Sequence, residues 1–140
     1  MSMTQRNIKN GAAQYRLVDV ESSVKGASPH KLIQLLLEGA ISKIQVARVL
    51  MDNRQIGPKC EHIERALAII NGLKSALNLK AGGQIAANLD ALYDYVGRRL
   101  IIANYYNDTA ILEEVVRLLK EILIGWNGIA PKVIGDATSA

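Results

Sequence analysis

The chain has 140 residues, a formal net charge of +4 and a hydrophobic content of 49%, which fits one domain that buries about two-thirds of its unfolded surface. Its single cysteine, Cys60, excludes an intrachain disulfide, and no apolar run approaches the roughly 20 residues that a membrane-spanning helix requires. We therefore expect a cytoplasmic protein without membrane insertion.

Residues 1–51 predict an arm followed by a first helix. Residues 1–27 are polar and weakly patterned, so we expect an arm or a short capping helix there. Ser28-Pro29 predicts a helix start, because the serine hydroxyl can accept an unpaired backbone N–H and a proline at the first helical position loses no hydrogen bond. This helix extends to about Met51 and is apolar on several sides, as expected for a helix with more than one neighbour.

A second and a third helix follow. Residues 53–58 are a connection, with Gly57-Pro58 before the next helix. The second helix has a buried stripe consisting of Ile63, Leu67, Ile70, Leu73 and Leu77. We expect this helix to end at residues 81–83, because glycine accepts the left-handed conformation at a helix end. The third helix then covers roughly residues 84–106.

The fourth helix completes the predicted fold. Asn107-Asp108 provides a turn and a cap, and a stripe at helical spacing ends at Trp126. Four helices of about 20 residues with short links favour an all-α, antiparallel up-down-up-down four-helix bundle. We expect the bundle to cover residues 28–130, and residues 131–140 to form a flexible tail.

The third helix carries more apolar residues than one buried face requires. One face at three- and four-residue spacing consists of Ile85, Leu89, Leu92, Val96, Leu100 and Ala103. A second row at steps of four consists of Tyr93, Gly97, Ile101 and Tyr105, and a third side carries Tyr95, Ile102 and Tyr106. A helix this apolar needs a second partner. The pattern leaves open a large core, a permanent dimer interface, or a groove for another polypeptide.

The sequence predicts neither an enzyme nor a metal or cofactor site. A di-iron bundle requires a glutamate three residues before each histidine, but Ala27 precedes His30 and Lys59 precedes His62 at that distance. The 17 basic residues are scattered, with Arg98-Arg99 as the only adjacent pair. No phosphate-binding track results, so no nucleic-acid partner is expected.

Several blocks of residues carry a family resemblance. The first two are Ala27-Ser28-Pro29-His30-Lys31-Leu32-Ile33 and Leu36-Leu37-Glu38-Gly39-Ala40. The next are Gly82-Gly83-Gln84-Ile85-Ala86, Leu92-Tyr93-Asp94-Tyr95, Arg98-Arg99-Leu100, Asn107-Asp108 and Gly125-Trp126. In order and spacing they closely resemble the FliS family of flagellar secretion chaperones, over residues 12–132.

The resemblance implies a binding protein. It implies a cytoplasmic bundle that binds the disordered carboxy-terminal region of flagellin, prevents premature polymerisation and aids delivery to the flagellar export apparatus. Other flagellar regulators are further partners to consider. A face that covers the apolar helical faces of flagellin would block its self-association, which accounts for the apolar surplus of the third helix.

The expected partner-binding residues lie mainly on the third helix. We expect Tyr93, Ile101 and Tyr105 to line a groove, with Ile102 beside them and a notch at Gly97 that permits close approach.

Four further positions complete the expected site. Val116 and Leu123 of the fourth helix would form a facing wall, and Arg98 would contact client carboxylates or carbonyls. The resemblance implies that the amino-terminal arm can cover part of this surface, so we expect Tyr15 to act as a displaceable cap.

Two alternatives remain open at the level of sequence. One is an adaptor or regulator bundle for a different flagellar or secretion protein. The other is a homodimer without a client, which predicts concentration-dependent dimerisation and no affinity for flagellin.

Overall fold

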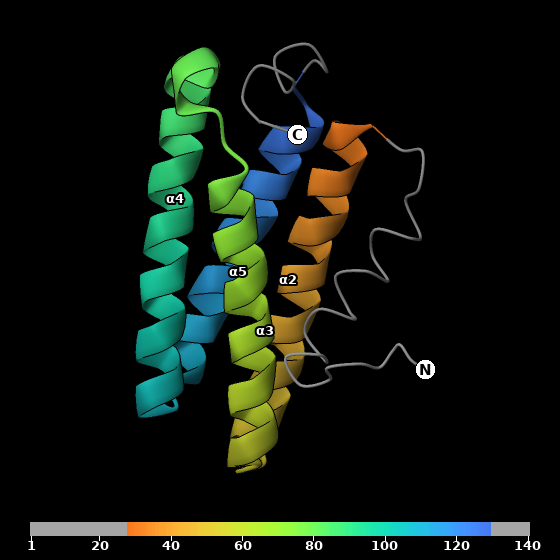
Figure 1. Ribbon diagram of the computed structural model, residues 1–140. Coiled ribbons are helices and arrows are strands. Elements are labelled where there is room, and N and C mark those ends of the chain that lie inside the picture. The colour runs from red at the N-terminus through yellow and green to blue at the C-terminus, as the bar shows by residue number, and fades with distance from the viewer. Residues whose placement is uncertain (1–27, 130–140) are drawn as a thin grey trace, which may run out of the picture.

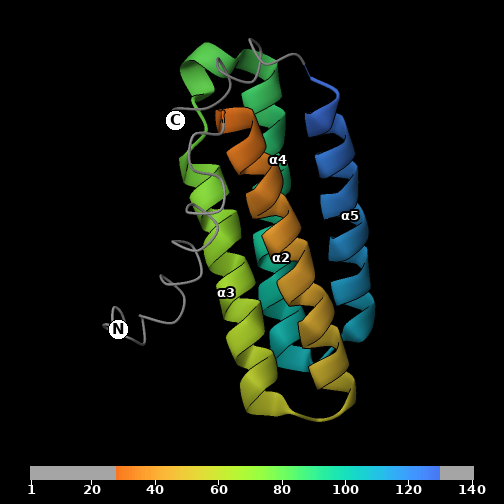
Figure 2. The same cartoon turned by 90° about the vertical axis from the view of Figure 1, so that its right-hand side faces the viewer.

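The computed structural model describes residues 28–129, so the predicted arm with Tyr15 and the predicted tail lie outside the described residues. The described residues form α2 (Pro29–Asp52), α3 (Ile56–Ser75), α4 (Leu79–Tyr106) and α5 (Thr109–Asn127). Consecutive helices run antiparallel and are joined by short turns (Figures 1 and 2). Each helix packs against its neighbour in the chain, and α5 also packs against α2. The prediction of an all-α four-helix bundle is confirmed.

Polar side chains cap three of the helices at their amino-terminal ends. The Ser28 hydroxyl accepts a hydrogen bond from the backbone N–H of Lys31 at 3.3 Å, with proline at the next position, as the sequence predicts. The Asp108 carboxylate accepts from the N–H groups of Ala110 and Ile111 at 3.0 and 3.3 Å. Because these N–H groups have no partner within the helix, the caps fix where α2 and α5 begin.

The boundary between α3 and α4 differs from the prediction. Helix α3 ends at Ser75, not at residues 81–83, and α4 already begins at Leu79. The reason is Asn78, whose side-chain oxygen accepts a hydrogen bond from the N–H of Ala81 at 3.0 Å and caps a new helix. Gly83 therefore lies inside α4, where its φ of 54° and ψ of −135° produce a kink.

The kink at Gly83 gives a testable prediction. Gly83→Ala is expected to lower the free energy of unfolding by about 1–2 kcal/mol, because a side chain strains the backbone at this positive φ. A Cβ atom at Gly83 would meet nothing within 4 Å, so the backbone alone accounts for the loss. Urea denaturation followed by circular dichroism measures it.

Gly72→Ala is the matched control for this prediction. Gly72 lies in α3, and a Cβ atom there also meets nothing within 4 Å, but its backbone is helical. Alanine should therefore raise stability by about 0.5–1 kcal/mol. If both variants were stabilised, the bend at Gly83 would not be required by the fold.

The core runs along the bundle axis and takes residues from all four helices. The largest fully buried side chains are Trp126, Tyr93, Lys59, Leu37, Ile44, Ile63, Ile70, Leu73, Leu100, Leu112 and Leu119. The predicted stripes of the second and fourth helices contribute Ile63, Ile70 and Trp126 to this core. Leu77 follows the end of α3 but still packs against the core. On the third helix the predicted face is buried at Val96, Leu100 and Ala103, whereas Ile85, Leu89 and Leu92 are only partly buried.

A reciprocal contact joins the first and last described helices. The indole Nε1–H of Trp126 donates to the carbonyl oxygen of His30 at 3.1 Å, and the His30 Nε2 lies 3.2 Å from the carbonyl oxygen of Trp126. A carbonyl can only accept, so the His30 ring carries a hydrogen on Nε2. The two rings also stack with centroids 5.7 Å apart. This pair ties the start of α2 to the end of α5.

Lys59 of α3 is a buried cation, with 1% of its surface exposed. Its ammonium donates to the backbone oxygen of Asn104 at 2.9 Å and to the Asn104 side-chain oxygen at 2.8 Å. Asn104 belongs to the last turn of α4, where backbone carbonyls lack partners within the helix and favour a positive charge. Lys59 therefore caps the carboxy-terminal end of a neighbouring helix.

Candidate functional site

The predicted second row of apolar residues on α4 passes from the core to the surface. Tyr93 is only 2% exposed and Gly97 is buried, whereas Ile101 is 57% and Tyr105 is 78% exposed. An α-helix has 3.6 residues per turn, so a step of four residues overshoots a full turn by about 40°. Three such steps carry the row about a third of the way round the helix, and Tyr93 and Tyr105 therefore have different surroundings.

The two inner members of the row contribute to the packing of the bundle. Burial raises the pKa of the Tyr93 hydroxyl above its ordinary value, as expected where the phenolate would be poorly solvated. A Cβ atom added to Gly97 would lie 3.4 Å from the Leu67 side chain of α3. The notch at Gly97 is therefore closed by α3, and it permits close packing of α3 against α4.

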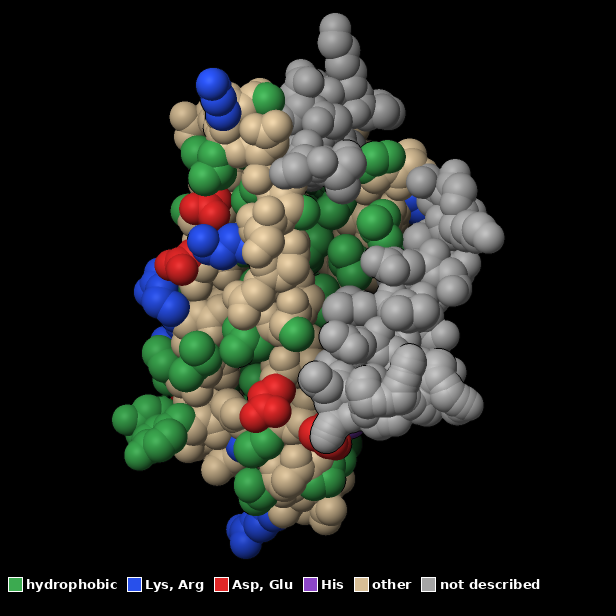
Figure 3. Space-filling view, viewed as in Figure 1, with side chains coloured by type: hydrophobic (Ala, Val, Ile, Leu, Met, Phe, Trp, Pro, Cys, Tyr) green, Lys and Arg blue, Asp and Glu red, His purple; other side chains and the backbone are tan. Residues whose placement is uncertain are grey.

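The outer members belong to an exposed apolar cluster at the carboxy-terminal end of α4. We call it the α4 terminal patch, and it consists of Ile101, Ile102, Tyr105 and Tyr106, all of which are exposed. The two tyrosine rings meet edge to face with centroids 4.8 Å apart. Hydrophobic side chains project from the lower end of α4 in Figure 3. Large exposed apolar clusters of this kind mark binding surfaces more often than isolated apolar residues do.

Polar residues on α4 fix the α5 side of this patch. Tyr95 donates its hydroxyl hydrogen to Glu114 of α5 at 2.6 Å, and the Arg99 Nε–H donates to the other Glu114 oxygen at 3.1 Å. Because Ile102 and Tyr106 lie seven and eleven residues after Tyr95, they share the flank of α4 that faces α5. The patch therefore continues toward α5.

Hydrogen bonding shifts the pKa values of Glu114 and Tyr95 in opposite directions. The hydrogen bond from Tyr95, followed by the hydrogen bond and charge of Arg99 and by the charge of Arg117, lowers the pKa of Glu114. The same hydrogen bond raises the pKa of the Tyr95 hydroxyl, because the phenol donates to a carboxylate. Glu114 is therefore ionised, and each of its oxygens accepts one hydrogen bond from α4.

Arg98, a predicted contact residue, is exposed on α4. Its Nε–H donates to Asp94 at 3.0 Å, four residues earlier on the helix, and its guanidinium carbon lies 5.8 Å from the centre of the Tyr95 ring. An exposed pair of this kind contributes little to stability and can exchange partners. Arg98 thus lies on the exposed side of α4, three and four residues before Ile101 and Ile102 of the α4 terminal patch.

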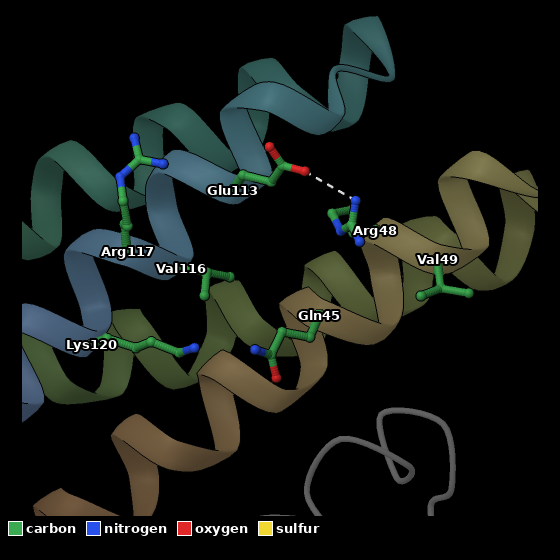
Figure 4. Close-up of a pocket in the computed structure, with 7 residues that line it drawn as sticks. All are labelled: Gln45, Arg48, Val49, Glu113, Val116, Arg117 and Lys120. Atoms are coloured by element: carbon green, nitrogen blue, oxygen red, sulfur yellow. Dashed lines mark hydrogen bonds and ion pairs between the residues drawn. The ribbon is translucent and has the colours of Figure 1, made fainter.

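The other two predicted residues lie on α5, away from α4. Val116 and Leu123 are partly buried and pack against the core. Val116 also lines a groove of about 390 Å³ between α2 and α5, together with Gln45, Arg48, Val49, Glu113, Arg117 and Lys120 (Figure 4). The structure thus brings Ile101, Ile102 and Tyr105 together, but it places Val116 on a separate face.

Residues of this α2–α5 groove were missed by the sequence reasoning. Arg117 and Lys120 line the groove together with Val116. The sequence did contain one signal for this, because two residues that are three apart lie on the same face of a helix. What no pattern in the sequence indicated is that Arg48 and Val49 of α2 lie opposite them. Lys59 was also missed, since one lysine in a helical segment gives no sign that it is buried.

The described residues offer no metal site and no membrane span. Within residues 28–129, no three His, Cys, Asp or Glu side chains come close enough together to hold a metal ion. None of the helices in this part of the chain is long and apolar enough to cross a membrane.

Known proteins resemble this chain over most of its length. Residues 11–133 match the family model described as flagellar protein FliS. The chain is 46% identical to the flagellar secretion chaperone FliSB of Pseudomonas aeruginosa over 117 residues, which cover 84% of this chain and 93% of the relative. It is 45% identical to the flagellar secretion chaperone FliS of Salmonella typhimurium over 124 residues, with 88% and 92% covered.

A more distant relative shows the same match. The flagellar secretion chaperone FliS of Bacillus subtilis is 33% identical over 106 residues, which cover 76% of this chain and 78% of the relative. Identity at this level over most of both chains, together with the four-helix bundle and the family model, leads to one conclusion. This chain belongs to the FliS family of flagellar secretion chaperones.

Proposed function

We propose that this protein is a cytoplasmic export chaperone that binds the carboxy-terminal region of flagellin, prevents its premature polymerisation and aids its delivery to the flagellar export apparatus. The relatives named above are flagellar secretion chaperones, which supports a flagellar client. The observation that carries the proposal is the α4 terminal patch, where two aliphatic and two aromatic side chains stand exposed side by side.

The patch suits an apolar anchor from a disordered client. A segment that lays apolar side chains on Ile101 and Tyr105 would be shielded from other copies of itself. Tyrosine adds a large contact area with few rotatable bonds, which limits the entropy lost on binding. The client loses its own conformational entropy when it orders, and this loss restrains the net affinity. Such a complex can form in the cytoplasm and still release its client for export.

Calorimetric titration with the carboxy-terminal segment of the cognate flagellin tests the proposal. The wild-type chain should form a one-to-one complex with a negative heat-capacity change, because apolar surface is buried. Ile101→Asp should weaken binding by at least about 30-fold, the loss expected at an interface hot spot when a charge is placed in an apolar contact.

Leu79→Asp is the matched control. Leu79 lies at the opposite end of the same helix and is 54% exposed, close to the exposure of Ile101. It should leave the affinity unchanged within about twofold, as surface changes away from the contact usually do. Equal losses in the two variants would show that the patch is not the contact site. No binding by folded wild-type protein, with dimers that grow with concentration, would instead favour the homodimer.

A further inference from the structure

The groove between α2 and α5 combines an apolar floor with surplus positive charge. Val49 and Val116 supply apolar surface from the two helices, and the lining residues include three cations against one carboxylate. Figure 4 shows Lys120 extending from α5 toward Gln45 of α2, with Val116 between the two helices. A surface of this composition differs from the α4 terminal patch, which carries no cation among its four residues.

One of the three cations is already neutralised. The Arg48 guanidinium donates to Glu113 across the groove at 3.0 Å and lies 3.8 Å from Asp52 on its own helix. The pair formed by Arg48 and Glu113 spans α2 and α5 (Figure 4). The only carboxylate of residues 28–129 that lines the groove is therefore already paired with Arg48.

Neither Arg117 nor Lys120 forms an ion pair within 4.0 Å among residues 28–129. The charge of Arg117 contributes to the lowered pKa of Glu114, but the hydrogen bonds of that carboxylate go to Tyr95 and Arg99. Arg117 and Lys120 are also three residues apart on one helix, so their like charges repel each other. A carboxylate placed between them would relieve this repulsion.

We propose that the α2–α5 groove binds a second segment of the client polypeptide, which places a carboxylate side chain between Arg117 and Lys120 and an apolar side chain on Val49 and Val116. This inference rests on the proposed function, since the client is the flagellin tail. It adds an acidic contact site on a face of the bundle separate from the α4 terminal patch. The client would then contact both faces, and the charged contact would fix its register while the apolar contacts supply most of the affinity.

Titration of the flagellin segment into Arg117→Glu/Lys120→Glu tests the site. The double reversal should raise the dissociation constant at least about tenfold, because a client carboxylate would meet two like charges. Arg117→Gln/Lys120→Gln should raise it by less, about threefold to fivefold, because attraction is lost without repulsion. Added salt should weaken wild-type binding and have little effect on the Gln variant.

Lys31→Glu/Lys80→Glu is the matched control. Both lysines are exposed and lie at the starts of α2 and α4, at the opposite end of the bundle from the turn that follows Arg48. Each double reversal lowers the formal net charge by four, from +4 to 0. The control variant should bind the segment with nearly wild-type affinity. Comparing the two double variants therefore separates a local contact from the effect of the protein's net charge.

The outcomes distinguish this inference from the proposed function. If the wild-type chain binds flagellin and both double reversals weaken binding equally, the groove is not an acidic contact site, while the chaperone function stands. If sedimentation shows that the Arg117 and Lys120 reversal abolishes self-association and leaves flagellin affinity unchanged, the groove belongs to a second copy. If the folded wild-type chain does not bind the segment, the proposed function fails and this inference fails with it.

A cycle of changes on both partners identifies the charge itself. Client carboxylates are changed one at a time from Asp to Asn or from Glu to Gln. One such change should weaken binding to the wild-type chain, but it should have no further effect in Arg117→Gln/Lys120→Gln. Independent losses at every client position would contradict the proposed pairing.

Discussion

Trp126→Ala is expected to lower the free energy of unfolding by about 3–5 kcal/mol, as replacement of a buried tryptophan does when the surrounding core cannot collapse. Trp126 is among the largest fully buried side chains, and the substitution also removes the hydrogen bond from its Nε1–H to His30 and the stacked ring contact. Urea denaturation followed by far-ultraviolet circular dichroism measures the change, since the variant lacks the only tryptophan.

Two further variants separate the sources of this loss. Trp126→Phe keeps most of the ring volume and lacks the donor, so it should cost about 1–2 kcal/mol. Ile124→Ala, a large side chain on the same helix that is exposed, should change stability by less than about 0.5 kcal/mol. A loss below about 1 kcal/mol for Trp126→Ala would mean that the α2–α5 end contact does not hold the bundle together.

Asn104→Ala is expected to cost about 2–3 kcal/mol, because it removes an acceptor from a buried ammonium. The Lys59 Nζ would keep only the backbone oxygen of residue 104, and burial keeps water from replacing the lost partner. The double variant Lys59→Met/Asn104→Leu should be more stable than Asn104→Ala, since it removes the charge together with its partner.

A control variant tests whether burial is the cause. Lys80→Met, at an exposed position of α4, should change stability by less than about 0.5 kcal/mol. If the effects of Lys59→Met and Asn104→Leu simply added, the two side chains would not be coupled, and the bond from Lys59 to the Asn104 side chain would contribute nothing to stability.

The contact between Lys59 and Asn104 affects the end of α4 that carries the exposed patch. Lys59 caps the last turn of α4, which is the turn that carries the α4 terminal patch. Asn107 follows this turn with a φ of 55°, and its N–H bonds back to Ala103, so the helix ends at a defined residue. The exposed tyrosines therefore stand on a turn that is anchored from its buried side, and in the proposed complex this would reduce the entropy lost on binding.

Much of the fold followed from local patterns. The caps at Ser28 and Asp108 and the spacing of Ile63, Ile70 and Trp126 depend on contacts within one helix or on one face of it. The error at the α3–α4 boundary was also local. Gly82-Gly83 was interpreted as a helix end, but a cap at Asn78 had already started the next helix, so the glycine conformation made a kink instead.

Less of the candidate site could be predicted from the sequence. The second row on α4 was predicted as one surface, but its drift of about 40° per step places Tyr93 in the core and Tyr105 in solvent. Where the core ends along such a row depends on how closely α3 approaches, and Gly97 and Leu67 set that approach. The predicted roles of Ile101, Ile102 and Tyr105 in client binding stay predictions, as do those of Arg98, Val116 and Leu123.

The sequence by itself determined the four helices, part of the core and the membership of the FliS family, because hydrophobic periodicity, caps and residue blocks are properties of short segments. Only the tertiary structure decided which surfaces remain open. The ammonium of Lys59 meets Asn104 45 residues away, and the groove of Arg117 and Lys120 exists because α5 packs beside α2. Contacts between distant segments depend on the arrangement of all four helices, and no local pattern encodes that arrangement.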